Sequence, residues 1–239
     1  MKNIALIFAG GSGNRMNTRS KPKQFLELHG KPIIIYTLEV FENHSDIDGI
    51  IVVCVEDWIA YLQKLLKKFE ITKVKEIVPG GGTGQESIYN GLSSAVKHYP
   101  QDSLVLIHDG VRPLIYDTTI SDNIAAAKEF GSSITCVPTT ETLVIVNEDS
   151  SLNIPPRSKS LLARAPQTYV LSEIWEIHQR AKSEGINNFV DSCTMMSYYG
   201  KTMHTIIGPV ENIKITNPSD FYIFRAIEEI HENQQIFGL

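Results

Sequence analysis

The sequence has few cysteines, no long apolar run and no excess of basic residues, and each absence excludes a class of protein. Its three cysteines, Cys54, Cys136 and Cys193, stand far apart without paired spacing. This disfavours a disulfide framework or a cysteine zinc site and fits a reducing cytoplasm. The formal charge of -5 in 239 residues argues against general nucleic-acid binding, which normally needs a basic face. The apolar start of the chain is too short to span a bilayer and lacks a signal-peptide pattern, so we expect a cytoplasmic protein without a membrane segment.

Acidic residues are also absent from the start of the chain, where the first one is Glu27. Five lysines and arginines precede it, and they surround the glycine-rich stretch "AGGSGNR" (9–15). Glycine-rich loops after a strand can cradle phosphate oxygens with backbone N–H groups, although they also serve as structural turns. The loop lacks the ending of a P-loop and the spacing G-x-G-x-x-G. The cations without a nearby carboxylate favour the phosphate interpretation, because a nucleoside triphosphate carries about four negative charges.

Short apolar runs alternate with longer amphipathic segments. The runs predict strands at 4–9, 49–55, 103–109 and 132–138. The segments between and after them predict helices at 32–42, 57–68, 85–98 and 117–130. Strands that are continuously apolar are covered on both faces. The alternation therefore predicts an α/β fold with a mostly parallel sheet and a ligand site at the carboxyl ends of its strands.

The stretch 139–168 breaks this alternation. Here "TLVIV", the turn-prone "NEDSS" and "LNI" predict a hairpin that projects from the body. After it we expect a helix at 171–184, a short strand near 203–207, a strand in "NIKIT" (212–216) and a terminal helix from Pro218 that Asn217 caps. No repeat or linker interrupts the chain, so we expect a single domain over 1–239 with an inserted arm at about 139–165.

Two further loops place polar residues at the same predicted edge. The stretch "PGGGTGQES" (79–87) sets three glycines before a helix start, which favours anions; Ser87 could equally be the helix cap. The stretch "HDGVRP" (108–113) sets Asp109 and Arg112 at a strand end. They could form a plain ion pair, or Asp109 could hold Mg²⁺ beside a triphosphate. We expect His108 to be structural.

Together the motifs "AGGSGNRM", "KPKQF", "GGGTGQES", "HDGVRP", "APQT", "VDSC" and "ENIKIT" resemble, in order and over nearly the whole chain, a known family. These are the 2-C-methyl-D-erythritol 4-phosphate cytidylyltransferases and their close relatives, the ribitol-5-phosphate cytidylyltransferases. The resemblance implies a Rossmann-like three-layer nucleotidyltransferase fold with an inserted β-arm, CTP as donor, Mg²⁺ as cofactor and a homodimer whose arms cross.

The resemblance also assigns roles to residues. It implies catalytic roles for Arg15, Lys23, Arg157 and Lys214. It places the nucleotide on Phe8, Ala9, Gly10, Gly11, Ser12, Gly13, Gly81, Gly82, Ser87 and Asp109. It places the acceptor on Arg112, Thr142, Arg157 and Lys214, and the metal on Asp109. From the residues alone, Arg157 would equally be an exposed arm residue and Lys214 a strand-edge lysine.

Two motifs that differ between these two groups of enzymes indicate the acceptor. "VDSC" and "PTTET" are closer to the ribitol-phosphate enzymes and favour a pentitol phosphate, converted to a CDP-alcohol for cell-wall or capsule polymers. The chain departs from both groups at Gly84 and Ala165. The alternatives are the methylerythritol-phosphate enzyme of isoprenoid synthesis and a nucleotide-binding regulator without catalysis. In either enzyme the acceptor phosphate would attack the α-phosphorus of CTP, so catalysis would be mainly positioning and charge neutralisation.

Overall fold

A seven-stranded sheet organises the chain in the computed structural model, which describes residues 1–10 and 21–237, and side chains as far as residue 233. The strands of this sheet are β1 (Asn3–Ala9), β4 (Gly49–Cys54), β5 (Val74–Pro79), β6 (Leu104–Asp109), β7 (Ser132–Pro138), β10 (Leu161–Val170) and β11 (Thr205–Ile207). The α-helices of the described chain are α1 (Ile33–Asn43), α2 (Ile59–Lys68), α3 (Gly84–His98), α4 (Asp117–Phe130), α5 (Leu171–Ser183), α6 (Ser192–Tyr198) and α7 (Pro218–Phe237).

The strand order in this sheet is β11-β7-β10-β6-β1-β4-β5. Strand β1 pairs in parallel with both β4 and β6, and β4 pairs in parallel with β5. Strand β10 runs antiparallel to its neighbours β6 and β7, so it alone opposes the others in this sheet. The predicted mostly parallel α/β fold is confirmed, and the carboxyl ends of β1, β4, β5 and β6 meet at one edge.

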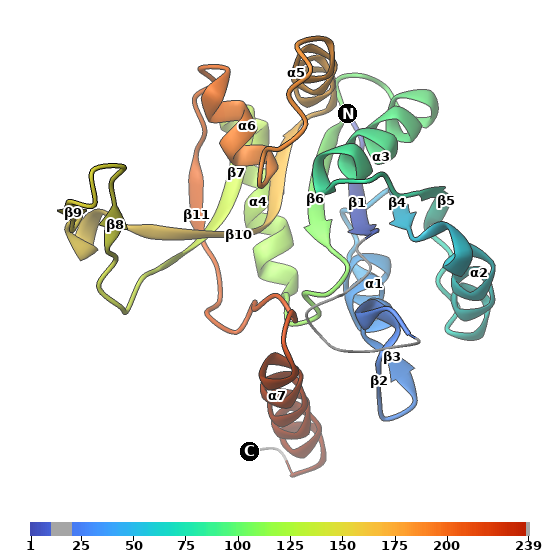
Figure 1. The fold of residues 1–239 in the computed structure, drawn as a ribbon. Helices are drawn as coiled ribbons and strands as arrows, with labels where there is room; N and C mark the ends of the chain where they lie inside the picture. Colours follow the sequence, from blue (N-terminus) through green and yellow to red (C-terminus); the bar gives the residue numbers. More distant parts are fainter. Residues whose placement is uncertain (11–20, 238–239) are drawn as a thin grey trace.

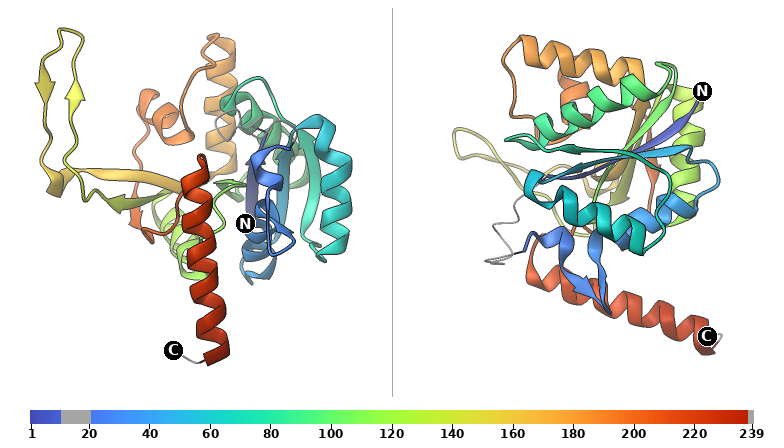
Figure 2. Two further views of the ribbon diagram at one scale, coloured as in Figure 1. Left: turned by 60° about the horizontal axis from the view of Figure 1, so that its bottom comes forward. Right: turned by 90° about the vertical axis from the view of Figure 1, so that its right-hand side faces the viewer.

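Helices cover both faces of the sheet (Figures 1 and 2). Alternate side chains of β1 explain why: Ala5 and Ile7 pack in a core with α1, α2 and α4. Ile4 and Leu6 point the other way, into a core with α3, α5 and α6. A strand buried on both faces needs apolar residues at every position, and "IALIFA" provides them. Among the helices of the described chain, none combines the length and apolar character needed to cross a bilayer.

The inserted arm projects from the end of the sheet (Figure 1). Its tip is a small antiparallel pair, β8 (Ile145–Val146) with β9 (Leu152–Asn153), as the hairpin pattern predicts. The chain then passes through a short 3-10 turn, η4 (Arg157–Lys159), and returns in β10. The last part of the stretch 139–168, from Leu161 on, therefore belongs to the central sheet, which the sequence did not indicate. Its buried side chains Gln167 and Thr168 are polar, and they hide the apolar signal of a core strand.

Other expectations at the carboxyl-terminal end differ from the structure. The predicted strand in "NIKIT" is wrong: residues 212–216 form an irregular segment. Its backbone is joined to the loop after β6 by the Ile215 N–H, which donates to the Val111 carbonyl at 2.9 Å. At the start of α7 the Asp220 carboxylate, not the Asn217 side chain, accepts the neighbouring backbone N–H groups of Thr216 and Asn217. A third core, which includes Leu28, Ile215 and Phe224, joins this region to a short hairpin. The hairpin consists of β2 (Glu27–Leu28) and β3 (Lys31–Pro32).

Candidate active site

Strand register brings the predicted loops together. Phe8 of β1 lies opposite Asp109 of β6, and the Gly110 N–H donates to the Phe8 carbonyl at 3.0 Å. On the other side, the Gly80 N–H donates to the Cys54 carbonyl at the end of β4. The three polar loops therefore leave the sheet side by side, at the edge where α/β folds bind ligands.

The two glycine loops touch each other. A Cβ built on Gly80 would lie 3.1 Å from the Cα of Gly10, and one on Gly10 would lie 2.9 Å from the Ser87 Oγ. Ser87 accepts a hydrogen bond from the Gly81 N–H at 3.1 Å and donates to the Thr83 carbonyl at 2.9 Å. The interpretation of Ser87 as helix cap is wrong, because Thr83 is the N-cap of α3. Ser87 instead fixes the second loop beside the first.

Glu86 occupies the amides of the second glycine loop. Its side chain accepts from the N–H of Gly82 at 2.7 Å and closes a capping box with Thr83. A Cβ on Gly81 would lie 2.4 Å from the Glu86 Cβ, so only glycine fits there. A ligand that used the Gly82 amide would have to displace the Glu86 carboxylate.

A buried cluster of charges lies at the end of β6. Asp109 Oδ2 lies 2.7 Å from Arg112 Nε, and its Oδ1 lies 2.5 Å from Lys214 Nζ. Arg112 Nη1 also donates to the Asn212 carbonyl, and the Asn212 side chain donates to the Ala165 carbonyl. The irregular segment 212–216 thus carries Lys214 to the sheet edge and links β6 to β10. The simple ion pair proposed for Asp109 and Arg112 is present, with Lys214 as a third member.

This cluster sets the ionisation of its members. Burial alone would raise the pKa of Asp109, but the charges of Lys214 and Arg112 lower it to about 2. The neighbouring imidazole of His108 is fully buried, and burial lowers its pKa to about 4. A neutral His108 can donate from Nε2 to the Arg112 carbonyl, 3.0 Å away. These contacts give His108 the structural role that the sequence predicts.

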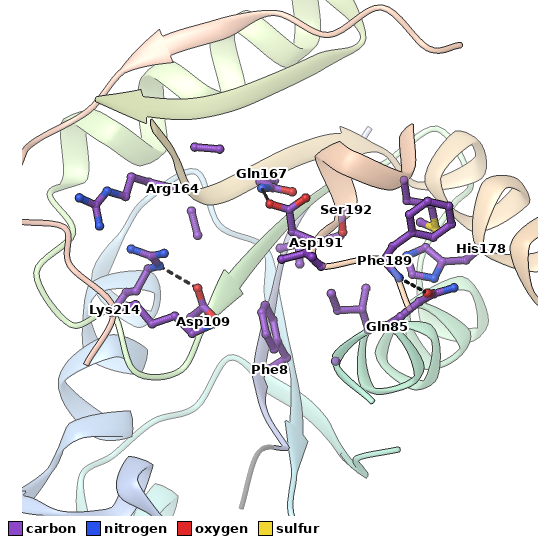
Figure 3. Close-up of a pocket in the computed structure, with 18 residues that line it drawn as sticks. Phe8, Gln85, Asp109, Arg164, Gln167, His178, Phe189, Asp191, Ser192 and Lys214 are labelled. Carbon is purple, nitrogen blue, oxygen red and sulfur yellow. Dashed lines mark hydrogen bonds and ion pairs between the residues drawn. The ribbon is translucent and has the colours of Figure 1, made fainter. Parts of the chain in front are cut away.

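A cavity of about 260 Å³ opens beside the cluster (Figure 3). Phe8 and Asp109 of the sheet edge form its floor, and the other lining residues come from β6, α3, β10, α5, α6, the segment before α6 and the irregular segments that carry Arg112 and Lys214. Its lining residues are Phe8, Gly84, Gln85, Ile88, Ile107, Asp109, Arg112, Ala163, Arg164, Ala165, Gln167, His178, Phe189, Val190, Asp191, Ser192, Met195 and Lys214. Four predicted site residues therefore meet in one cavity: Phe8, Asp109, Arg112 and Lys214.

The other predicted residues lie elsewhere. Gly10 and Gly82 sit in the loops beside the cavity, Ala9 ends β1 and Ser87 lies in the first turn of α3. Gly81 lines a neighbouring cavity that shares Gln85 and His178 with the first. Gly11, Ser12, Gly13 and Arg15 lie outside the described residues. Thr142 and Arg157 are exposed on the arm and do not line this chain's own cavity.

Lys23 lies near the cavity but not in the wall that the structure describes. It begins the 3-10 turn η2 (Lys23–Phe25), and the adjacent Gln24 donates to the carbonyl of Ala9 at 2.6 Å. Burial opposes ionisation of Asp220, yet backbone hydrogen bonds and the charge of Lys23 hold its pKa below the usual value. Gln24 therefore docks the "KPKQF" segment against the end of β1, beside the start of α7.

Several cavity residues were not predicted from the sequence. Asp191 caps α6, where its carboxylate accepts from the Thr194 N–H at 2.8 Å. Gln167 approaches the same carboxylate at 3.4 Å and accepts from the Cys193 N–H at 2.9 Å. An aspartate three residues before Thr194 is a helix-cap signal that could have predicted α6. Arg164 carried no such signal, because its neighbours are arm residues.

A Mg²⁺ site at Asp109 fits the donor set. Among the described residues, no group of three or more histidine, cysteine or acidic side chains is placed to hold a metal ion, and Asp109 is the carboxylate at the sheet edge that could contribute to such a site. Mg²⁺ is commonly held by one or two carboxylates together with substrate phosphates. An ionised carboxylate offers about four acceptor positions, and Arg112 and Lys214 leave some of them open.

Known proteins resemble this chain in sequence over nearly its whole length. A ribitol-5-phosphate cytidylyltransferase of Vibrio parahaemolyticus is 54% identical over 99% of this chain and 100% of its own length. One of Streptococcus agalactiae is 50% identical over the full length of both chains. A 2-C-methyl-D-erythritol 4-phosphate cytidylyltransferase of Clostridium botulinum is 36% identical over 95% of this chain and 98% of its own.

The crystal structure of 4-diphosphocytidyl-2C-methyl-D-erythritol synthase from Anaerococcus prevotii superimposes with a TM-score of 0.82. It is 25% identical, and the match covers 95% of this chain and 96% of that one. The sequence matches the family description over residues 3–229, which include every loop of the site. The chain therefore belongs to the 2-C-methyl-D-erythritol 4-phosphate cytidylyltransferase (IspD) family.

Proposed function

We propose that the protein transfers a cytidylyl group from CTP to ribitol 5-phosphate, giving CDP-ribitol and pyrophosphate. The observation that carries this proposal is the cavity at the sheet edge, where Arg112 and Lys214 flank Asp109 beside the two glycine loops. Such a site suits two phosphate compounds at once. The ribitol-5-phosphate enzymes at 50–54% identity support this acceptor over methylerythritol phosphate, whose enzymes are named among relatives at 36–38%.

The reaction needs no strong base. The acceptor is a phosphomonoester that is ionised near neutral pH, so one of its oxygens can attack the α-phosphorus of CTP directly. A new P–O bond forms, the bond between the α-phosphorus and the bridging oxygen breaks, and that oxygen leaves with pyrophosphate. The protein contributes alignment of the two substrates and fixed positive charge. This agrees with the low pKa of Asp109, which keeps the carboxylate ionised and unable to serve as a general acid.

Each charged group has a place in this scheme. Lys214 and Arg112 would hold acceptor oxygens while Asp109 fixes their positions, and Phe8 forms the floor between them. Lys23 and Arg15 would stabilise charge on the reacting phosphorus. Mg²⁺, held by Asp109, would neutralise charge on the phosphates when bound.

The arm points to a homodimer. Arg157 is exposed on η4, and the arm also exposes apolar side chains that a monomer leaves uncovered. The exposed apolar residues of the arm are Val144, Ile145, Val146, Leu152, Ile154, Leu161 and Leu162. Clusters of this kind mark interaction surfaces. In a two-fold dimer the partner subunit would cover these apolar side chains, and the arm would deliver Arg157 to the partner's cavity.

Mixing two inactive variants tests this arrangement. If Arg157 acts in the partner's site, a mixed dimer of Arg157→Ala and Lys214→Ala chains contains one site with both residues intact. A 1:1 mixture should then regain about a quarter of wild-type activity through random pairing. Failure to regain activity, with mixed dimers verified by mass, would place Arg157 in its own subunit's site or outside the mechanism.

Pyrophosphate release tests the proposed function itself. The protein is supplied with CTP and Mg²⁺ and, in turn, with ribitol 5-phosphate and 2-C-methyl-D-erythritol 4-phosphate. We expect turnover with ribitol 5-phosphate to be far higher. The opposite preference would support the isoprenoid enzyme, and CTP binding without turnover of either would support a regulator. The free cysteines and the need for CTP fit a cytoplasmic enzyme that prepares an activated alcohol for surface polymers.

A further inference from the structure

Arg164 is a cation of the cavity that has no partner among the residues that the structure describes. It lines the cavity from β10, and its Nε is buried without a hydrogen bond. The other two cations of the cavity wall, Arg112 and Lys214, both contact Asp109. Asp191, the second acidic residue of the wall, already accepts bonds from Thr194 and Cys193. No described carboxylate forms an ion pair with Arg164.

An unpaired guanidinium at a half-buried site is costly. Burial, and then the nearby charge of Arg112, lower the pKa of Arg164, which means that the surroundings disfavour its positive charge. Polar groups buried without partners destabilise the folded state. Ligand-binding sites often keep such groups at a cost in stability, because the ligand supplies the hydrogen-bond partner that the protein lacks. A bound anion would therefore stabilise the charge of Arg164 at this position.

The fold indicates which anion this is. In the sheet, β10 lies on the far side of β6 from β1 and β5, the strands that carry the glycine loops. In Figure 3, Arg164 lies on the Lys214 side of the cavity, whereas Gln85 and His178 lie at the opposite end. The nucleotide loops and Arg164 thus face the cavity from different sides. Arg164 is placed beside the second phosphate compound rather than the triphosphate.

The backbone at Arg164 is also held in place. The carbonyl of the next residue, Ala165, accepts from the Asn212 side chain at 2.6 Å, and the Asn212 carbonyl accepts from Arg112 at 2.8 Å. A chain of two hydrogen bonds thus joins the strand at Arg164 to the Asp109 cluster. A guanidinium can bind two oxygens of a phosphate at once, and a fixed backbone favours that geometry.

We infer that Arg164 binds the phosphomonoester group of the acceptor, together with Lys214 and Arg112, within its own subunit. This inference rests on the proposed function for the identity of the acceptor. It makes Arg164 a determinant of acceptor affinity that is separate from nucleotide binding. It also implies that each subunit holds the acceptor phosphate with its own cations, independently of what the arm of a partner adds.

Steady-state kinetics of three variants test this role. Arg164→Gln should raise the KM for ribitol 5-phosphate by about 10- to 100-fold, the loss expected for a charge-assisted hydrogen bond, and leave the KM for CTP within about twofold. Arg164→Lys should fall between Arg164→Gln and wild type, because it keeps the charge and loses the fork. Arg180→Gln is the matched control, since Arg180 is exposed on α5 and pairs with Glu184.

Stability separates binding from a structural role. Arg164→Leu retains an apolar side chain and removes the unpaired charge, so its Tm should equal or exceed that of wild type. Its kcat/KM for the acceptor should fall. A lower Tm with parallel losses for CTP and acceptor would make Arg164 structural. An unchanged acceptor KM in Arg164→Gln would overturn the inference.

The design also separates this inference from the proposed function. If wild type prefers methylerythritol phosphate, the proposed acceptor is wrong, and the same KM comparison with that acceptor still judges Arg164. If neither acceptor turns over, inorganic phosphate serves as the probe. At constant ionic strength it should raise the Tm of wild type more than that of Arg164→Gln, and equal shifts would contradict the role.

Discussion

Gly81 lies so close to Glu86 that a Cβ on the glycine would lie 2.4 Å from the Cβ of the glutamate. The glutamate side chain meanwhile holds the amide of Gly82 and caps α3. The second glycine loop is thus shaped by the first turn of the helix that follows it. This explains the glycines of "PGGGTGQES" by close packing as well as by any contact with phosphate.

Substitution of Gly81 should therefore disturb the loop. We expect Gly81→Ala to lower the free energy of unfolding by about 1–3 kcal/mol, as overpacking does, and to raise the KM for CTP by at least about tenfold. Gly84→Ala is the control, because a Cβ there meets nothing within 4 Å. It should leave the free energy of unfolding unchanged or raise it slightly. Urea unfolding compares the stability of the two variants, and equal losses would contradict the steric explanation; CTP kinetics are measured for Gly81→Ala against wild type.

Loss of the Asp109 charge should unbalance its cluster. Asp109→Asn leaves the buried Arg112 and the half-buried Lys214 without their common carboxylate. We expect the free energy of unfolding to fall by roughly 3 kcal/mol, because one partner of a buried ion pair remains uncompensated, and turnover to fall by at least about a hundredfold. The exposed Asp122 provides the control variant Asp122→Asn. Wild-type turnover in Asp109→Asn would remove Asp109 from the mechanism.

Lys23 is expected to act on the reacting phosphates although it lies beside α7. Lys23→Ala should lower kcat by roughly two orders of magnitude, as loss of a charge contact to the transition state does. Affinity for CTP, measured by calorimetry without an acceptor, should change much less. An unchanged kcat would mean that Lys23 serves only its neighbours, such as Asp220.

His178 should make stability depend on pH. Burial lowers its pKa to about 3, whereas an unfolded histidine has a pKa of about 6.5. Between these values the unfolded chain binds a proton that the folded chain does not. The free energy of unfolding therefore falls as pH decreases from about 6.5 towards 3, and it is highest above that window.

A variant without this imidazole isolates the effect. His178→Leu should reduce the slope of unfolding free energy against pH between pH 4.5 and 6 by up to about 1.4 kcal/mol per unit, the value for one proton. His108, whose pKa burial lowers to about 4, contributes the same sign and remains in the variant. Denaturant titrations across this range measure the slope, and an identical slope would show that His178 is not protonated on unfolding.

Sequence patterns predicted much of the fold and part of the site. The apolar runs identified β1, β4, β6 and β7 because strands covered on both faces need continuous apolar residues. The loop "HDGVRP" identified Asp109 and Arg112, since parallel strands end at one edge. Phe8 and Lys214 were assigned by resemblance to known enzymes, and the strand predicted around Lys214 is absent.

Other features depend on contacts that one sequence does not reveal. The core position of β10 is stabilised by a buried polar network in which Thr168 contacts Asn123 and Asn123 contacts Thr135, so it lacks an apolar signature. Arg164 looks like an arm residue until the sheet order places β10 beside β6. The role of Thr83 as cap, by contrast, was readable from the sequence, because a threonine followed three residues later by Glu86 is the pattern of a capping box, and the Glu86 N–H donates to the Thr83 hydroxyl.

In the proposed reaction a phosphate oxygen of the acceptor attacks the α-phosphorus of CTP in the cavity beside Asp109. The most direct measurement is ³¹P NMR of the reaction with ribitol 5-phosphate whose phosphate oxygens carry ¹⁸O. We predict that all label appears in a CDP-alcohol, including its bridging oxygen, and that the pyrophosphate is unlabelled. Label in the pyrophosphate would contradict this mechanism, and so would the absence of a CDP-alcohol product with folded protein that binds CTP.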